Sequence, residues 1–127
     1  MTLAVNLDHV VSEVTEVFHA YEVALVANDA MTLNDMFWNS AHVVRFGVDD
    51  VQMGHREVAR WRTTQSPIPS GRRLADTRVV AFGEDLAVVT TTFRYPGRKA
   101  IGRQSQTWVR MSEGWRIVSA HVSEIPS

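Results

Sequence analysis

The sequence predicts an α+β domain in which N-terminal helices pack on a strongly curved antiparallel sheet. In much of the stretch 1–65, apolar side chains recur every three or four residues, which is the period of an amphipathic helix. After residue 71 they alternate with polar side chains, which is the period of a strand. The breaker Ser-Pro-Ile-Pro-Ser-Gly at residues 66–71 separates the two parts. Helices followed by a run of strands are typical of α+β domains.

Three helices are expected before the breaker. The first covers residues 7–28, and its apolar stripe consists of Leu7, Val10, Val11, Val14, Val17, Phe18, Tyr21 and Leu25. Asp29 can cap a second, short helix that runs through residue 37, because its carboxylate can accept hydrogen bonds from the free N–H groups of the first turn. The third helix covers residues 55–65.

The strands are one short segment and a long meander. The short segment is expected at residues 41–46, between the second and third helices. The long strands are predicted at residues 72–82, 86–95, 99–111 and 115–125, with turns at 83–85, 96–97 and 112–114. Strands of this length exceed the usual 5 to 6 residues or so, and long strands twist and bend. We therefore expect the sheet and its helices to enclose a cone.

Composition limits the classes of function. The 127 residues predict a single domain, 1–127, and the absence of cysteine excludes disulfides, thiolate nucleophiles and cysteine-based metal sites. A net charge of −1 gives no overall electrostatic support for a nucleic-acid or anionic membrane partner. We expect neither partner, and a cytoplasmic location, because no signal segment or long apolar run is found.

Standard catalytic and cofactor motifs are absent. The sequence contains no dinucleotide, nucleotide-triphosphate, nucleophile-elbow or zinc-protease motif, and the five histidines lack metal-ligand spacing. We therefore expect no cofactor and no metal ion. Residues 1–59 carry a net charge of −7 and residues 60–127 a net charge of +6, so the two halves can complement each other. Because Lys99 is the only lysine among 13 basic residues, a small anionic ligand bound by arginine is a second possibility.

Two residues are the main candidates for chemistry. Arg45 stands in the short predicted strand between apolar neighbours, where a guanidinium is costly unless it meets an anion. That anion is either a ligand or one of the internal partners Glu22, Asp35 and Asp76. Tyr21 lies on the apolar stripe of the first helix, so its buried hydroxyl needs a partner, either a structural carbonyl or a ligand.

Strand alternation assigns the side chains of the last two long strands to faces. Gln104, Gln106, Trp108 and Arg110 share one face, and Arg103, Ser105, Thr107 and Val109 share the other. On the final strand, Val118, Ala120 and Val122 lie opposite Trp115, Ile117, Ser119 and His121. Large apolar groups thus fall on both faces. We expect the helices to cover one face and a second copy of the chain to cover the other, giving a homodimer through the outer sheet face.

Several segments resemble the NTF2-like (SnoaL-like, ketosteroid-isomerase-like) superfamily. They are YEVALVAND at residues 21–29, FWNS at 37–40, VVRFG at 43–47, IGRQSQTWVR at 101–110 and GWRIVSAHVS at 114–123. Within it they are most similar to the AtzH-like and HpxZ-like family associated with oxalurate and cyanuric-acid catabolism. The resemblance extends over nearly the whole chain. It implies a cystatin/NTF2-like conical barrel with an inner cavity and an outer face that forms dimers, but the fold alone decides no reaction.

The resemblance also implies roles for individual residues. A tyrosine at the position of Tyr21 donates a hydrogen bond to a developing oxyanion in the related isomerases, whereas Arg45 replaces their acidic base. By the same analogy Gln104, Gln106 and Val122 face the cavity, although a plain ladder of glutamines is the alternative. Trp38 either lines or covers the cavity mouth or belongs to the core. His121 and Arg103 fall on the outer face and are secondary candidates.

These inferences favour a cofactor-free enzyme of nitrogen-compound catabolism that acts on a carboxylated urea or ureido acid. Arg45 would bind a carboxylate and Tyr21 would donate a hydrogen bond or proton as CO2 leaves. Hydrolysis would also need a base to activate water, for which Glu22 and His42 are the candidates, His42 also as a ligand-binding residue. The alternatives are a dimeric, non-catalytic module that binds an acidic metabolite or a partner amidase, and an enzyme of the isomerase or polyketide-cyclase type.

Overall fold

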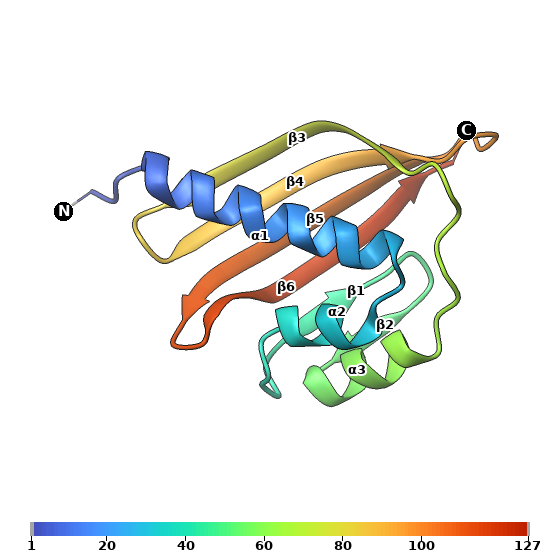
Figure 1. Cartoon of the computed structure of the whole chain (residues 1–127), viewed down its shortest axis with the longest axis horizontal. Coiled ribbons are helices and arrows are strands. Elements are labelled where there is room, and N and C mark those ends of the chain that lie inside the picture. Colours follow the sequence, from blue (N-terminus) through green and yellow to red (C-terminus); the bar gives the residue numbers. More distant parts are fainter. Residues whose placement is uncertain (1, 127) are drawn as a thin grey trace.

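The computed structural model describes residues 2–126 and shows three helices packed on a six-stranded sheet (Figure 1). The helices are α1 (Asp8–Val26), α2 (Ala30–Met36) and α3 (His55–Thr63). The strands are β1 (Val44–Phe46), β2 (Val51–Met53), β3 (Arg73–Phe82), β4 (Leu86–Arg94), β5 (Ile101–Met111) and β6 (Gly114–Ile125). The α+β class and the helix-then-strand order expected from the sequence are confirmed.

The helices form where the apolar periodicity places them. On α1 the buried stripe includes Val10, Val14, Phe18 and Tyr21, which pack against the sheet. Asp29 caps α2, with its Oδ1 accepting a hydrogen bond from the backbone N–H of Thr32 at 3.1 Å. The cap turns the chain directly after α1, so α2 and α3 lie beyond the end of α1 and beside the short strands (Figure 1).

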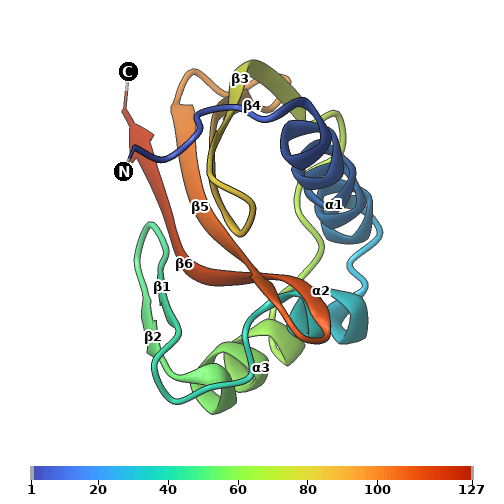
Figure 2. The ribbon, with the colours of Figure 1, turned by 90° about the vertical axis from the view of Figure 1, so that its left-hand side faces the viewer.

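The sheet is mixed and open rather than wholly antiparallel. Its strand order is β2-β1-β6-β5-β4-β3, and β1 runs parallel to β6 while all other neighbours are antiparallel. The parallel pair arises because the chain crosses from β1 through β2 and α3 before it enters the meander. The four long strands curve strongly, α1 lies opposite them on the inner side of the curve, and α2, α3 and the small β1–β2 hairpin lie toward one end (Figure 2). The cone is thus made by sheet and helices together and not by a closed ring of strands.

Two short-strand expectations need correction. The strand expected at 41–46 is restricted to β1, and the segment of β2 was not expected to form a strand at all. Each contains three residues, too few for alternation to show in the sequence. Their pairing places Arg45 directly opposite Gln52. Both of these side chains are buried on the inner face of the sheet.

The alternation expected along β6 is broken by a bulge. Thr107 pairs with Ser119, but the next residue, Trp108, pairs with Ile117, so Val118 is an extra residue in its strand. On the N-terminal side of the bulge, Trp115 and Ile117 are buried and belong to the core cluster. Their assignment to the outer face was therefore wrong. His121 lies on the C-terminal side of the bulge and is exposed, as the alternation indicated.

The core lies between α1 and the inner face of the sheet, with Trp108 and Phe37 among its largest fully buried side chains. The structure contains no helix within residues 2–126 that is long and apolar enough to cross a membrane.

Candidate functional site

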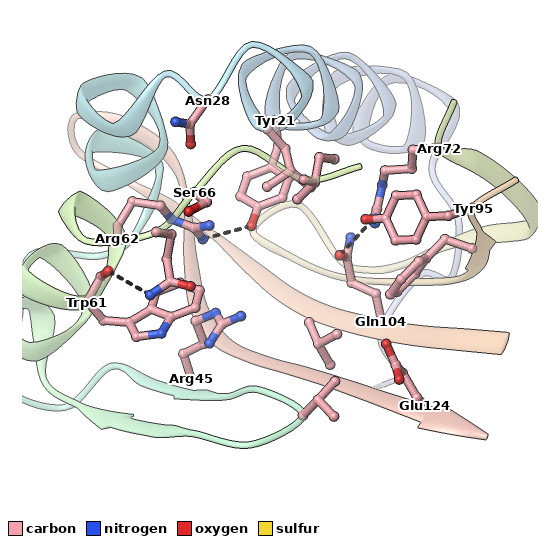
Figure 3. Close-up of a pocket in the computed structure, with 16 residues that line it drawn as sticks. Tyr21, Asn28, Arg45, Trp61, Arg62, Ser66, Arg72, Tyr95, Gln104 and Glu124 are labelled. Carbon is pink, nitrogen blue, oxygen red and sulfur yellow. Dashed lines mark hydrogen bonds between the residues drawn. The ribbon is translucent and has the colours of Figure 1, made fainter. Parts of the chain in front are cut away.

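A pocket of about 210 Å³ opens between α1, α3 and the inner face of β5 and β6 (Figure 3). Three of its lining residues are arginines, from three different segments of the chain. The residues that line it are Tyr21, Leu25, Asn28, Arg45, Val48, Trp61, Arg62, Gln65, Ser66, Ile68, Arg72, Phe93, Tyr95, Gln104, Val122 and Glu124. The fold brings them together because β1, α3 and the breaker segment all contribute side chains that face α1 and the long strands at this pocket.

Arg45 reaches this pocket from β1 and is only 8% exposed. Its Nη1 donates to Asp50 Oδ1 at 2.7 Å and to Gln52 Oε1 at 2.9 Å. Burial lowers the pKa of the Arg45 guanidinium, and the neighbouring charge of Arg62 acts in the same direction, whereas Asp50 opposes it. An arginine keeps its proton at neutral pH despite such a shift. The residue is therefore a buried cation with a single carboxylate partner.

Arg62, on α3, has no carboxylate partner among the described residues. It is only 6% exposed, and its buried Nε makes no hydrogen bond. Its Nη2 donates to Tyr21 Oη at 3.3 Å. A buried guanidinium without an anion is costly, because its lost hydration is not replaced by an opposite charge. Arg62 therefore marks the place where a guest anion would be most strongly stabilised.

Trp61 joins the two arginines into one cluster. The guanidinium carbon of Arg45 lies 3.7 Å from the centroid of the Trp61 ring, and that of Arg62 lies 4.6 Å from it. An indole ring attracts cations through its electron-rich face and restricts the side chains that stack on it. Tyr21 descends from α1 toward the same cluster (Figure 3). We refer to Tyr21, Arg45, Trp61 and Arg62 as the cationic end of the pocket.

The opposite wall of the pocket contains an arginine, Arg72, whose charge is paired with a carboxylate and whose nitrogens all make hydrogen bonds. Arg72 Nε donates to Glu22 Oε1 at 2.8 Å, and its two Nη atoms donate to Tyr95 Oη at 3.0 Å and to Gln104 Oε1 at 3.2 Å. Burial alone lowers the pKa of Arg72, but the hydrogen bonds and charge of Glu22, together with Tyr95, outweigh it and raise that pKa. All three nitrogens are engaged, so this wall is a structural network.

Comparison with known proteins assigns the chain to a family. The model of the AtzH-like family matches residues 3–127, almost the entire sequence. The chain belongs to the AtzH-like family. A search of curated proteins found no significant match to this chain.

Solved structures agree with the AtzH-like assignment. A protein of unknown function from Pectobacterium atrosepticum is 41% identical, with 95% of this chain and 94% of that chain covered and a TM-score of 0.92. A cystatin-like fold protein from Burkholderia xenovorans is 42% identical, with 98% of each chain covered and a TM-score of 0.95. A proposed dehydratase of the NTF2-like family from Streptomyces avermitilis is 22% identical over 94% and 99%, with a TM-score of 0.78, and shows the fold alone. The cystatin/NTF2-like fold expected from the resemblance is thus confirmed.

The structure brings together four of the site residues expected for this AtzH-like protein. Tyr21, Arg45, Gln104 and Val122 all line the pocket. The internal partner of Arg45, however, is Asp50 and not Glu22, Asp35 or Asp76.

Three other expected residues lie away from the pocket lining. Trp38 is half-buried against the core, and its ring is 6.2 Å from that of the exposed His42. Gln106 is fully buried and its Oε1 accepts a hydrogen bond from the indole nitrogen of Trp108 at 3.1 Å. Gln106 faces inward as expected but does not line the pocket. None of these three side chains therefore belongs to the lining of this pocket.

Sequence reasoning missed Arg62, Trp61 and Arg72. In α3 three arginines share one polar helix, and its few apolar residues do not show which arginine turns inward. Arg72 follows the breaker at the point where the chain enters the sheet. The available signal was the excess of arginine over lysine in residues 60–127. No group of three histidine, cysteine, aspartate or glutamate side chains in the part of the chain that the structure describes could hold a metal ion.

Proposed function

We propose that the pocket binds a small carboxylated urea or ureido acid and that the protein releases CO2 from it without a cofactor. The observation that supports this most directly is Arg62, a guanidinium buried at the pocket with no carboxylate beside it in residues 2–126. A guest carboxylate would supply the missing charge and could accept paired hydrogen bonds from a guanidinium. The family resemblance, which the AtzH-like match supports, implies a substrate of this chemistry.

The size of the pocket favours a small guest. Sites for drug-sized molecules have volumes of roughly 300 to 1,000 Å³, whereas this pocket has about 210 Å³. A ureido acid has fewer than about ten heavy atoms and fits that scale, whereas a fused ring system does not. Arg45 also occupies the position at which the resembling isomerases have their acidic base. Both features argue against an enzyme of the isomerase or polyketide-cyclase type.

The proposed reaction breaks the bond between a urea nitrogen and its carboxylate carbon. The electron pair of that bond stays on the ureido group, and CO2 leaves. Tyr21 Oη already accepts a hydrogen bond from Arg62, while its own hydrogen has no acceptor among the described residues. That hydroxyl can therefore donate its proton to the ureido group as negative charge develops there, and then regain a proton from solvent. Arg45 and Arg62 hold the guest and stabilise the charge.

The structure favours decarboxylation over hydrolysis of the urea. Hydrolysis needs a base to activate water, and both candidates are unsuited to it. The carboxylate of Glu22 is bound by Arg72 and also accepts from Gln104 Nε2 at 3.2 Å, so both of its oxygens are engaged. His42 is exposed and does not line the pocket. Loss of CO2 requires only a proton donor and positioned cations, which the cationic end supplies.

The test combines binding and turnover. Thermal unfolding is measured with oxalurate, a stable ureido carboxylate, and with its neutral amide as the matched control. A ligand at about 100 times its dissociation constant adds about 2.7 kcal/mol of stability, so oxalurate should raise the Tm clearly and the amide should not. CO2 release from allophanate, an N-carboxylated urea, should exceed the spontaneous rate. Stabilisation without CO2 release would support the non-catalytic binding module instead, and equal effects of oxalurate and its amide would contradict an anion site.

A further inference from the structure

Apart from the residues proposed to contact the ligand, the β1–β2 hairpin contains a set of hydrogen bonds that fixes the orientation of Arg45. We propose that Asp50 and Gln52 are positioning residues for Arg45, and that glycine at position 47 is what allows Asp50 to reach it. The inference rests on the proposed function, because it assigns a purpose to the free edge of the Arg45 guanidinium.

Asp50, Gln52 and Arg45 form a closed triangle of hydrogen bonds. Arg45 Nη1 donates to Asp50 Oδ1 and to Gln52 Oε1, and Gln52 Nε2 donates to the same Asp50 Oδ1 at 2.9 Å. Gln52 is buried and stands opposite Arg45 in the β1–β2 pair, so its backbone position is fixed by the sheet. Each member of the triangle thus limits the rotation of the other two.

The triangle engages only one edge of the guanidinium. Nη2 and Nε of Arg45 have no hydrogen-bond partner within residues 2–126, and one face of the group stacks on Trp61. With one edge and one face held, the remaining donors have a single direction left. Arg45 lines the pocket, so that direction serves a guest carboxylate (Figure 3). A flexible arginine would lose rotational entropy on binding, whereas this one has lost it during folding.

Position 47 has room for no side chain. The turn between the strands is closed by the backbone N–H of Gly47, which donates to the carbonyl of Asp50 at 2.8 Å. A Cβ on Gly47 would overlap Asp50 Oδ1 and would lie 2.8 Å from Arg45 Nη1. The φ of Gly47 is not in the left-handed region, unlike that of five other glycines. Alanine at this position would therefore act by displacing the carboxylate from Arg45, and not by straining the backbone.

The first test measures oxalurate affinity by calorimetry at 25 °C for Gly47→Ala, Asp50→Ala and Asp50→Asn. We expect Gly47→Ala and Asp50→Ala to weaken binding roughly tenfold, since a misplacement of about 1 Å can cost that much or more. Asp50→Asn keeps a side-chain oxygen for Arg45 Nη1 and should retain affinity within about twofold of wild type. The matched control, Asp49→Ala, changes an exposed carboxylate of the same turn and should leave affinity unchanged.

A second measurement needs no ligand. The Nη protons of a clamped guanidinium give separate, slowly exchanging NMR signals, and we expect these for Arg45 in the wild type and in Asp49→Ala. They should merge in Gly47→Ala and Asp50→Ala. Merged signals in the wild type, or wild-type affinity in Gly47→Ala, would overturn the positioning role. If instead oxalurate fails to bind the wild type while the separate signals persist, the proposed function is wrong, but Asp50 and Gln52 still position Arg45.

Discussion

Arg62 is the residue whose environment is hardest to explain without a ligand. Polar groups buried in proteins are normally satisfied, yet this guanidinium has a Tyr21 hydroxyl, an aromatic ring and no carboxylate in the described part of the chain. Desolvation of such a cation costs several kcal/mol, which must be offset elsewhere in the fold. A guest anion bound beside Arg62 would recover part of that cost.

Arg62→Met tests this directly. The change keeps a long apolar stem beside Trp61 and removes the charge, so the Tm without ligand should stay the same or rise. Oxalurate affinity should fall about ten- to hundredfold, the usual cost of a lost charge-assisted hydrogen bond. Arg60→Met, an exposed position on the same helix, is the control and should change neither quantity. A large fall in the Tm of Arg62→Met would show that the guanidinium stabilises the fold and would argue against a site for a guest anion.

Tyr21→Phe separates catalysis from binding. The ring remains packed against Phe37, with the centroids 6.4 Å apart, so the fold should be preserved. Without the hydroxyl there is no proton donor at the cationic end, and CO2 release from allophanate should fall at least tenfold while oxalurate binding changes much less. The measurement is the steady-state rate beside the calorimetric affinity. Full activity in this variant would remove Tyr21 from the mechanism.

At the scale of the residue, sequence reasoning found half of the cationic end. Arg45 and Tyr21 were identifiable because a charge or a hydroxyl inside an apolar pattern is conspicuous. Arg62 and Trp61 were not, since they lie on a short helix whose pattern is dominated by polar residues. Asp50 was missed as the partner of Arg45 because the β1–β2 turn that connects them cannot be inferred from strands of three residues.

At the scale of the element, α1 is fastened to the far end of the sheet by Glu13. Its Oε1 accepts from Arg110 Nη1 at 2.7 Å and from the indole nitrogen of Trp115 at 3.0 Å. These contacts join the first half of α1 to the β5–β6 turn, opposite the end that holds the pocket. The hydrogen bonds from Trp115 and then Arg110 hold the pKa of Glu13 below its ordinary value of 4.5.

The lowered pKa predicts a pH dependence of stability. A carboxylate whose pKa is lower in the folded state contributes stability above its unfolded pKa and loses it as the pH falls through the folded one. The free energy of unfolding should therefore decline below about pH 4.5 in the wild type, and Glu13→Gln should be less stable at pH 7 but decline less in acid. Urea unfolding at pH 7, 4.5 and 3 measures this. The control Glu16→Gln, on the exposed side of α1, should show the same pH dependence as the wild type. If the free energy of unfolding of Glu13→Gln fell with pH as steeply as that of the wild type, Glu13 would not be the source of the acid sensitivity.

Element identity was largely predictable, whereas strand register was not. The three helices and four long strands follow from periodicity and from the turns between them. The β6 bulge at Val118 could not be read from the sequence, because an inserted apolar residue next to another apolar residue, Ile117, carries no distinct mark. That single residue decides whether Trp115 and Ile117 fill the core or cover the outside.

For the assembly of the protein, the inward position of Trp115 and Ile117 removes the apolar side chains on which the expected homodimer rested. With two large apolar groups moved inward, the outer face no longer carries a hydrophobic stripe that demands a cover. What remains is two adjacent cross-strand rows over β4, β5, β6 and β1. They are Val88, Thr107, Ser119 and Val44, and Thr90, Ser105, His121 and Phe46. Over these four strands neither row contains a lysine, arginine or carboxylate, and the nearest charge in line is Arg78, which pairs with Thr90 on the edge strand β3. Depletion of charge is characteristic of the centre of protein interfaces.

We therefore propose that a second copy of the chain covers these rows, packing sheet against sheet with two-fold symmetry. Light scattering after size exclusion should then give twice the 14.3 kDa of one chain. Thr107→Arg would place one charge from each copy near the middle of the contact, where neither can be solvated or paired, and should yield the monomer mass with an unchanged fold. Ser112→Arg, at the exposed β5–β6 turn, is the control and should stay dimeric. Because the pocket lies on the inner face, the monomeric variant should still bind oxalurate. A monomer mass for the wild type would refute the dimer and would leave the proposal of an anion site unaffected.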